Sequence, residues 1–403
     1  MSERLLIKNC VLFDRLDDQQ STSILVEDGV IAEVGVEDAG GGCDVLDAGG
    51  RIVGPGFIDV HIQGAGGADV LDATPEALKT IAQTCARFGT TSFLATTVFK
   101  PGRENEHLRL AAECTGEDLG GANLLGIHIE GPFIAPEKRG MILPECVCAP
   151  SMQVLDEIME VTAGRLRMMT VAPELPGSLE VIRALVDSGV VTSFGHSSAT
   201  YEQTLAGFEA GISHVTHLFN VMPAIHHRSP GPLAAVFESE QVSAQVIFDG
   251  VHIHPSVLRL AFKLLGAERV VPITDGMQAM GMPDGKYVYN GIEYEARDGA
   301  ARYKDGTLIG TAVGLSELVK RMMTFTGCSF DAAIRSATAN PAKLLGIEGK
   351  KGAVAVGKDA DLVLLDDDGS VHTTIVGGKV VFQNQNSGMS TGRPTRMKKR
   401  ANA

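Results

Sequence analysis

The sequence predicts an α/β fold, a (β/α)8 TIM-like barrel joined to a small β-sandwich domain that is formed by both termini. Two patterns lead to this prediction. Short apolar runs alternate with segments of helical pattern in the middle of the chain, and strand–turn–strand patterns occupy both ends. The chain of 403 residues is 44% hydrophobic and 21% charged, a composition typical of a globular protein with a large core.

The two ends of the chain share a hairpin pattern. Residues 4–53 contain alternating apolar positions separated by Asp-Gly and Gly-Gly pairs, which are typical turn residues between antiparallel strands. Residues 353–385 show the same pattern. We therefore assign residues 1–53 and 353–385 to one β domain, and we expect the polar, basic segment 386–403 to be a disordered tail.

Eight β-rich apolar runs lie between Arg51 and Gly276, and most of the intervening segments have a helical pattern. Strands that are apolar on both faces and alternate with helices are typical of a parallel sheet covered on both sides. Eight such units in about 225 residues match the size of an eight-stranded barrel, so we assign residues 54–352 to the barrel. A doubly wound open sheet is the alternative. However, no dinucleotide-binding glycine fingerprint follows the first run, and we interpret the glycine-rich segment 64–67 as a turn.

Charge and composition exclude several classes of function. A net charge of −14 argues against nucleic-acid and anionic-membrane partners, which need a basic surface. No apolar run reaches the length of about 18 residues that a transmembrane helix needs, and the N-terminus lacks the apolar core of a secretory signal. Seven cysteines without a Cys-x-x-Cys pair fit a reducing compartment, so we expect a cytoplasmic protein.

Six polar residues stand out because each ends or follows one of the predicted barrel strands. They are His61, Glu130, His196, His217, His252 and Asp275. Barrel enzymes build their active sites at the carboxyl ends of the strands, where residues distant in sequence converge. Residues of these types at equivalent positions on separate strands therefore predict one shared catalytic site.

Glu130, His196 and His217 offer one carboxylate and two imidazoles, a donor set that suits zinc with one position left open for water. We expect one divalent metal ion per chain, zinc in the first place, with iron, manganese and cobalt as alternatives. Such a metal lowers the pKa of its water toward about 7. Asp275 is then the candidate acid/base, and His252 is the candidate group that polarises the attacked carbonyl.

The motifs that contain these residues are PGFID at 55–59, HIEGPF around Glu130, GHSSAT around His196, THLFN around His217 and ITDGM around Asp275. As a set they resemble the amidohydrolase superfamily, and within it most closely the N-acetylglucosamine-6-phosphate deacetylase family, over nearly the whole chain. The resemblance implies a barrel with a small β-sandwich, a divalent metal and a homodimer or homotetramer. It also implies hydrolysis of an N-acetyl-hexosamine 6-phosphate, first of all N-acetylglucosamine 6-phosphate, to acetate and the amino sugar phosphate.

Matched position by position, the resemblance implies that Glu130, His196 and His217 hold the metal and that Asp275 and His252 are catalytic. The substrate contacts that it indicates are His252, Asn220, Val221, Arg228, His227, Met141, Ile142, Leu308, Ile309 and Gly310. The guanidinium of Arg228 can bind a phosphate through two parallel hydrogen bonds, which suits a sugar 6-phosphate.

The chain departs from the family pattern at several places; two are small changes, TDGM in place of the commoner TDAM and LIGT in place of LAGS, and two change polar groups. Family members with two metals carry His-x-His at the end of the first strand, whereas this chain has His-Ile-Gln at 61–63. We therefore expect a single tightly held metal, with His61 and Gln63 in an assisting or second-site role. The loop that usually contains Gly-Ala-His contains Gly-Met-Ile at 140–142 here, so a polar substrate contact is missing.

These departures leave three alternatives open. The first is deacetylation of N-acetylgalactosamine 6-phosphate or another N-acyl amino sugar. The second is a different amidohydrolase, acting on N-acyl amino acids or cyclic amides; such enzymes often bridge two metals with a carboxylated lysine, but no lysine ends a predicted middle strand here. The third, more remote alternative is an inactive barrel that binds sugar phosphates.

Overall fold

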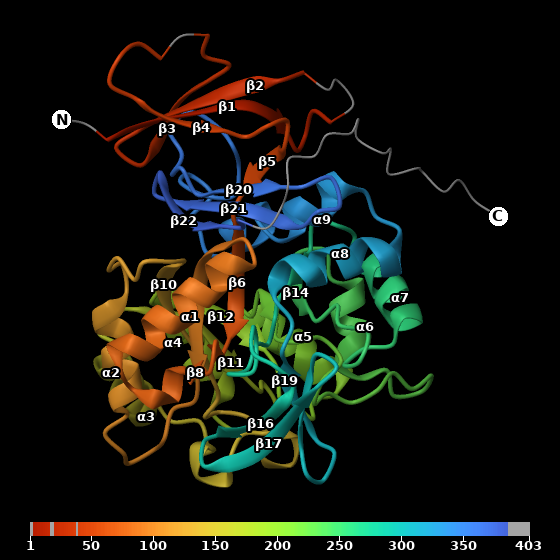
Figure 1. The fold of residues 1–403 in the computed structure, drawn as a ribbon. Helices are drawn as coiled ribbons and strands as arrows, with labels where there is room; N and C mark the ends of the chain where they lie inside the picture. The colour runs from red at the N-terminus through yellow and green to blue at the C-terminus, as the bar shows by residue number, and fades with distance from the viewer. Residues whose placement is uncertain (1–2, 17–19, 38, 386–403) are drawn as a thin grey trace.

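The computed structural model describes residues 3–16, 20–37 and 39–385, so the predicted tail 386–403 lies outside the described residues. Each of the eight predicted runs forms a strand of one parallel sheet, and the expected barrel is confirmed (Figure 1). In chain order the strands are β6 (Phe57–Ile62), β9 (Thr90–Thr97), β10 (Asn123–Glu130), β11 (Leu166–Val171), β12 (Val191–Phe194), β13 (His214–Val215), β14 (Ser243–Val246) and β15 (Val270–Pro272).

The ring closes between the first and the last barrel strand, just beyond the end of β15. The Asp275 N–H donates to the carbonyl of His61 over 3.0 Å, and the Gln63 N–H donates to the carbonyl of Gly276 over 2.9 Å. The backbone bonds that close the barrel thus place His61, Gln63 and Asp275 side by side at the carboxyl end of the strands.

Helices surround the barrel and connect its strands. They are α1 (Pro75–Arg87), α2 (Glu106–Cys114), α3 (Met152–Val161), α4 (Ser178–Asp187), α5 (Tyr201–Ala210), α6 (Gly231–Glu238), α7 (Pro255–Leu265), α8 (Leu315–Thr326), α9 (Phe330–Ser336) and α10 (Ala339–Leu344), with short 3-10 helices η1 (Val70–Asp72), η2 (Pro136–Lys138) and η3 (Pro144–Cys146). Local signals fix their ends. The Thr200 hydroxyl accepts the Gln203 N–H to cap α5, and Gly211 ends α5 with a positive φ of 118°. Within the described ranges, no helix is long and apolar enough to span a bilayer.

A small β domain contains strands from both ends of the chain, as predicted (Figure 1). Its strands are β1 (Arg4–Leu12), β2 (Thr22–Glu27), β3 (Val30–Val34), β4 (Asp44–Asp47), β5 (Ile52–Pro55), β20 (Leu362–Leu365), β21 (Val371–Val376) and β22 (Lys379–Gln383). The strand β1 pairs with β2 in its first part and with β5 at its end. Ile7 and Ile24 of the N-terminal strands share a core with Leu362 and Ile375 of the C-terminal ones, which holds the two ends together.

A four-stranded antiparallel sheet follows β15, and the sequence analysis did not predict it. It consists of β16 (Gly285–Tyr289), β17 (Ile292–Arg297), β18 (Ala300–Tyr303) and β19 (Leu308–Thr311). Figure 1 shows β16 and β17 at the end of the barrel opposite the terminal β domain. The strand β19 lies beside the segment that follows β15, because the Thr311 N–H donates to the Asp275 carbonyl over 2.8 Å.

The glycine-rich segment 64–67 forms the turn that the sequence predicted. It begins a two-stranded hairpin of β7 (Gly64–Ala65) and β8 (Ala68–Asp69), with Gly66 and Gly67 in the left-handed region at φ values of 65° and 88°.

Candidate metal centre

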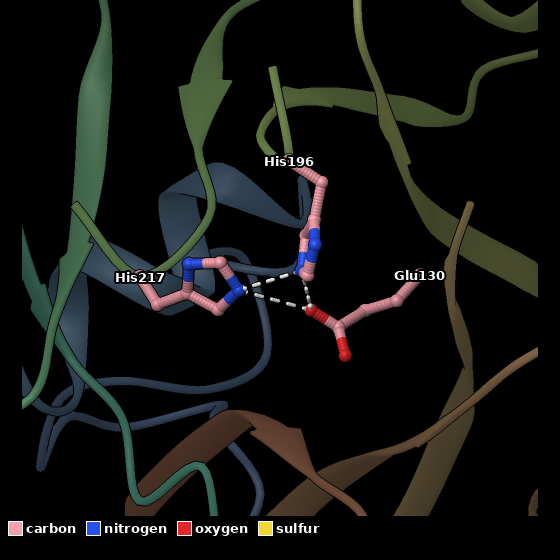
Figure 2. Close-up of side chains that lie close together, drawn as sticks. All are labelled: Glu130, His196 and His217. Atoms are coloured by element: carbon pink, nitrogen blue, oxygen red, sulfur yellow. Dashed lines mark hydrogen bonds and ion pairs between the residues drawn. The ribbon is translucent and has the colours of Figure 1, made fainter. Parts of the chain in front are cut away.

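Glu130, His196 and His217 converge at the carboxyl end of the barrel, from the end of β10 and from just beyond β12 and β13. Figure 2 shows the three side chains pointing toward one another. Glu130 Oε1 lies 3.2 Å from His196 Nε2 and 3.1 Å from His217 Nε2, and the two Nε2 atoms are 3.0 Å apart. The predicted ligands therefore meet at one point, although 87 residues separate Glu130 from His217.

The hydrogen bonds around the cluster show that it fits a cation. His196 Nδ1 donates to the carbonyl of Lys138 over 2.8 Å, so Nε2 of the neutral ring carries a lone pair rather than a proton. The carboxylate oxygen Glu130 Oε1 is also only an acceptor, and it lies 3.2 Å from His196 Nε2. Two acceptors this close repel each other unless a proton or a metal ion lies between them.

Within the part of the chain that the structure describes, this is the only group of three or more His, Cys, Asp or Glu side chains whose ligand atoms lie within 4.8 Å of one another. Glu130 is buried, and burial alone would raise the pKa of its carboxyl group. The imidazoles of His61, His196 and His217 outweigh burial and hold the pKa of Glu130 well below its usual value. The carboxylate is thus kept in the form that binds a metal.

The backbone at the cluster is held in an unusual conformation. His196, His217 and Asp275 all have positive φ values, of 49°, 26° and 47°, which L-residues other than glycine rarely adopt. Such conformations persist at functional sites because the surrounding fold enforces them. Here each one turns a side chain inward directly after a strand has ended.

Asp275, His61 and Gln63 form a second layer beside the cluster. His61 Nε2 lies 3.3 Å from Asp275 Oδ1 and 3.6 Å from Glu130 Oε1. Burial would lower the pKa of His61, but the carboxylates of Glu130 and Asp275 raise it to about 9 when no cation shares them. A cation bound to Glu130 opposes this effect and favours the neutral imidazole.

His252 is oriented by Asp249, a residue that the sequence analysis did not single out. His252 Nδ1 lies 2.6 Å from Asp249 Oδ2, and the other carboxylate oxygen accepts the backbone N–H groups of Val251 and His252 over 2.9 Å each. Burial tends to raise the pKa of Asp249, but these hydrogen bonds lower it overall. The signal in the sequence was the Asp-Gly-Val-His spacing, in which a carboxylate precedes a histidine by three residues.

A cavity of about 260 Å³ opens onto the metal cluster. It is lined by Glu130, Gly140, Met141, His196, His217, Asn220, Val221, His252, Asp275, Thr307, Leu308, Ile309 and Gly310. All of these were predicted as site residues except Gly140 and Thr307. The loop before β19 and the loop around Met141, which are far apart in sequence, thus form walls of the same cavity.

Five other predicted site residues do not line this cavity. His61 and Gln63 are buried beneath it. His227 and Arg228 lie on an exposed loop, with Arg228 Nη1 2.6 Å from His227 Nε2. Ile142 was expected to contact the substrate, but its side chain packs in a hydrophobic cluster with Val98, Ile134 and Cys146. At this loop, Met141 alone of the predicted pair faces the cavity.

Comparison with known proteins matches residues 52–381 to the family model described as the amidohydrolase family. The chain belongs to the amidohydrolase family. Membership confirms the resemblance found in the motifs and the expected enzyme class, a metal-dependent hydrolase.

Individual amidohydrolases are similar over nearly the whole chain. The N-acetylglucosamine-6-phosphate deacetylase of Bacillus subtilis is 35% identical over 388 residues, which cover 95% of this chain and 98% of that protein. The N-acetylgalactosamine-6-phosphate deacetylase of Escherichia coli O157:H7 is 36% identical over 352 residues, which cover 87% and 91%. The crystal structure of the N-acetylglucosamine-6-phosphate deacetylase of Pasteurella multocida superposes with a TM-score of 0.85 at 30% identity and covers 94% of this chain and 100% of that one.

Proposed function

We propose that the protein hydrolyses the acetamide of N-acetylglucosamine 6-phosphate to glucosamine 6-phosphate and acetate. The observation that carries the proposal is the convergence of Glu130, His196 and His217 beside Asp275 at the base of one cavity. The similarity of the whole chain to deacetylases of this substrate supports the choice of substrate.

Glu130, His196 and His217 would hold one divalent metal ion. A metal ion in such a site supplies Lewis acidity, which lowers the pKa of water and polarises a carbonyl group. Zinc is our choice because one carboxylate and two imidazoles suit a metal of borderline hardness; iron, manganese and cobalt bind the same donors.

Asp275 is the proposed acid/base. Its carboxylate takes the proton of the attacking water and delivers it to the nitrogen of the departing sugar, so that the C–N bond breaks with a neutral amine as the leaving group. His252 lines the cavity, and its Nδ1 contact with Asp249 fixes the ring with Nε2 available to the substrate carbonyl. Asn220 and Leu308 line the same cavity and are proposed to contact the sugar.

Arg228 is proposed to bind the 6-phosphate of the substrate, with His227 beside it. Both side chains are exposed on the loop between β13 and α6, so they are accessible to a charged group that projects from the cavity. A guanidinium recognises phosphate through paired hydrogen bonds, and phosphate binding far from the amide orients the reacting group.

The galactosamine epimer is the second candidate substrate, and the loop at 140–142 is the observation that favours it. The histidine of the Gly-Ala-His pattern corresponds to Ile142, whose side chain packs in a hydrophobic cluster, so the polar contact to the sugar is missing at this loop. Incubation of the zinc-loaded protein with both N-acetylhexosamine 6-phosphates and their unphosphorylated forms, with acetate as the readout, tests both candidates. We expect the N-acetylglucosamine 6-phosphate to be the best substrate. If the protein releases acetate from neither N-acetylglucosamine 6-phosphate nor N-acetylgalactosamine 6-phosphate, the proposal is ruled out.

We further propose a cytoplasmic homo-oligomer, a homodimer or a homotetramer. All seven cysteines lie within the described residues and none forms a disulfide, which fits a reducing compartment. The net charge of −14 supports a small-molecule substrate and no nucleic-acid or membrane partner.

A further inference from the structure

Glu174 follows the barrel strand β11 and contacts the loop that carries the proposed metal ligand His196, and the mechanism above gives it no role. Its Oε2 accepts the hydroxyl hydrogen of Ser197 over 2.7 Å, and its Oε1 accepts the backbone N–H of Ser198 over 2.6 Å. Ser197 is fully buried, and Glu174 is partly buried. Both carboxylate oxygens thus hold the two residues that directly follow His196.

The loop after β12 needs such a contact, because its backbone adopts a conformation that it would not keep by itself. His196 has a φ of 49°, and L-residues other than glycine rarely adopt a positive φ. The end of β12 is packed tightly just before it, since a Cβ atom at Gly195 would lie 2.7 Å from Thr170 Cγ2. Backbone conformations of this kind persist only where the surrounding structure enforces them. Contacts to this loop therefore keep the imidazole turned toward Glu130 and His217.

The segment that follows β10 holds the loop from the other side. The Ala135 N–H donates to the carbonyl of His196 over 2.9 Å, and the Ser198 hydroxyl donates to Glu137 Oε1 over 2.8 Å. The backbone N–H of Ser198, in contrast, donates to Glu174 alone among the described residues. Glu174 is therefore the group that fixes the backbone on the C-terminal side of His196, and hydrogen bonds to a carboxylate are stronger than those between neutral groups.

This contact matters most before the metal ion binds. In the metal-free protein, the loop has to keep His196 in its binding conformation without the help of the ion. If only a fraction of the molecules hold the imidazole in place, the apparent affinity for the metal falls by that fraction. Once the ion is bound, it holds the ring itself, so the loss of Glu174 should weaken metal binding more than it disturbs the metal-bound state.

We propose that Glu174 is a positioning residue, which holds the loop after β12 so that His196 is ready to bind the metal ion. This role rests on the proposed metal centre, and it does not depend on the identity of the substrate.

The test measures the dissociation constant of zinc, by competition with a chelator, for wild type, Glu174→Ala, Glu174→Gln and Ser197→Ala. Thermal unfolding of the metal-free proteins and acetate release at saturating zinc are measured in parallel. Glu180→Ala is the matched control, because Glu180 is exposed in the first turn of α4 and its carboxylate makes no hydrogen bond or ion pair with another described residue.

Glu174→Ala should raise the dissociation constant of zinc about tenfold or more, the scale on which groups that orient metal ligands act. Glu174→Gln keeps an oxygen for the Ser198 N–H and a polar amide beside Ser197, so its constant should stay within about threefold of wild type. Ser197→Ala removes one of the two contacts, and its constant should lie between those of wild type and Glu174→Ala. At saturating zinc, kcat of Glu174→Ala should return to within about threefold of wild type. The control should match wild type throughout.

An unchanged dissociation constant in a folded Glu174→Ala overturns the inference, even if its metal-free form melts at a lower temperature, because the role would then be structural only. An equal rise in Glu174→Gln also overturns it, because the negative charge rather than the hydrogen bonds would then be responsible. If Glu174→Ala does not fold, Ser197→Ala replaces it in the comparison, and an unchanged constant in that variant overturns the inference.

The same samples separate this inference from the proposed function. If wild type binds zinc tightly but releases acetate from neither sugar phosphate, the proposed function fails, and the dissociation constants alone decide the role of Glu174. If wild type binds no zinc, the metal centre and the role of Glu174 fail together.

Discussion

Gly310→Ala should reduce catalysis by moving Asp275, although residue 310 carries no functional group. Gly310 lies in β19 with φ of 138°, and a Cβ atom built there would be 2.4 Å from the carbonyl oxygen of Asp275. Ordinary van der Waals contact begins at 3.4 Å, so the two backbone segments must separate by about 1 Å. A displacement of about 1 Å in a catalytic group can cost about 10²-fold in rate, and we expect a fall in kcat of that order.

The assay measures acetate release from N-acetylglucosamine 6-phosphate together with thermal unfolding. Gly306→Ala is the control, because Gly306 lies in the loop between β18 and β19, has φ of 89°, and a Cβ there meets nothing within 4 Å. Gly306→Ala therefore introduces the same backbone strain, an alanine at positive φ, but its Cβ atom collides with no neighbouring atom. The link between β19 and Asp275 is refuted if Gly310→Ala folds and keeps wild-type kcat. It is also refuted if Gly306→Ala lowers kcat as much as Gly310→Ala does.

Three further predictions concern the acid/base, the phosphate contact and stability. Asp275→Asn should lose at least about 10²-fold in kcat while keeping one zinc per chain, and wild-type activity in this variant would favour the inactive sugar-phosphate-binding barrel or another acid/base. Arg228→Lys should raise KM for the phosphorylated substrate and leave KM for the unphosphorylated sugar unchanged. Equal effects on the two KM values would contradict the role of Arg228 in binding the phosphate. Burial lowers the pKa of His107 to about 4, and its Nε2 donates to the Val98 carbonyl over 2.8 Å. As the pH falls, His107 takes up its proton at a higher pH in the unfolded chain than in the folded one. The free energy of unfolding should therefore fall by about 3 kcal/mol through this group as the pH drops from about 6.5 to about 4. The free energy of unfolding, measured with urea at several pH values in this range, should fall less steeply with decreasing pH in His107→Gln than in wild type. An equally steep fall in the variant would contradict the assignment.

The barrel and the candidate metal site could be predicted from sequence because each rests on a local signal. Apolar runs of strand length mark the buried strands, and a polar residue of unusual type at the end of such a run is visible without any structure. Glu130, His196 and His217 are of this kind. Their meeting point follows from the parallel order of the barrel strands, which places all carboxyl ends on one side.

The sheet of β16–β19 was missed although its turns carry a signal, because Asn290-Gly291 joins β16 to β17 and Asp298-Gly299 joins β17 to β18. Its strand β17 alternates exposed residues with buried Tyr294 and Ala296, which is typical of a half-buried strand. Half of the residues of β17 are charged, so it differs from the apolar runs that mark the barrel strands. The cavity wall at Thr307 was missed for the same reason.

The direction of a side chain within a loop could also not be predicted from the sequence. Met141 and Ile142 are adjacent and both apolar, yet Met141 faces the cavity and Ile142 enters the hydrophobic core. The backbone decides which one turns inward, and Arg139 fixes it by donating from Nη1 to the Ile142 carbonyl over 2.9 Å. Asp249 likewise acts through a local turn, whose effect on His252 is visible only in three dimensions.

The most direct measurement is a zinc titration of the metal-free protein, with acetate release and bound zinc followed in the same samples. The protein stripped by a chelator should be inactive, and its activity should rise in proportion to bound zinc and saturate at one equivalent per chain. His196→Ala should lose both high-affinity zinc and turnover. Full activity in the stripped protein, or in His196→Ala without zinc, would contradict the assignment of Glu130, His196 and His217 as the metal site that serves the reaction.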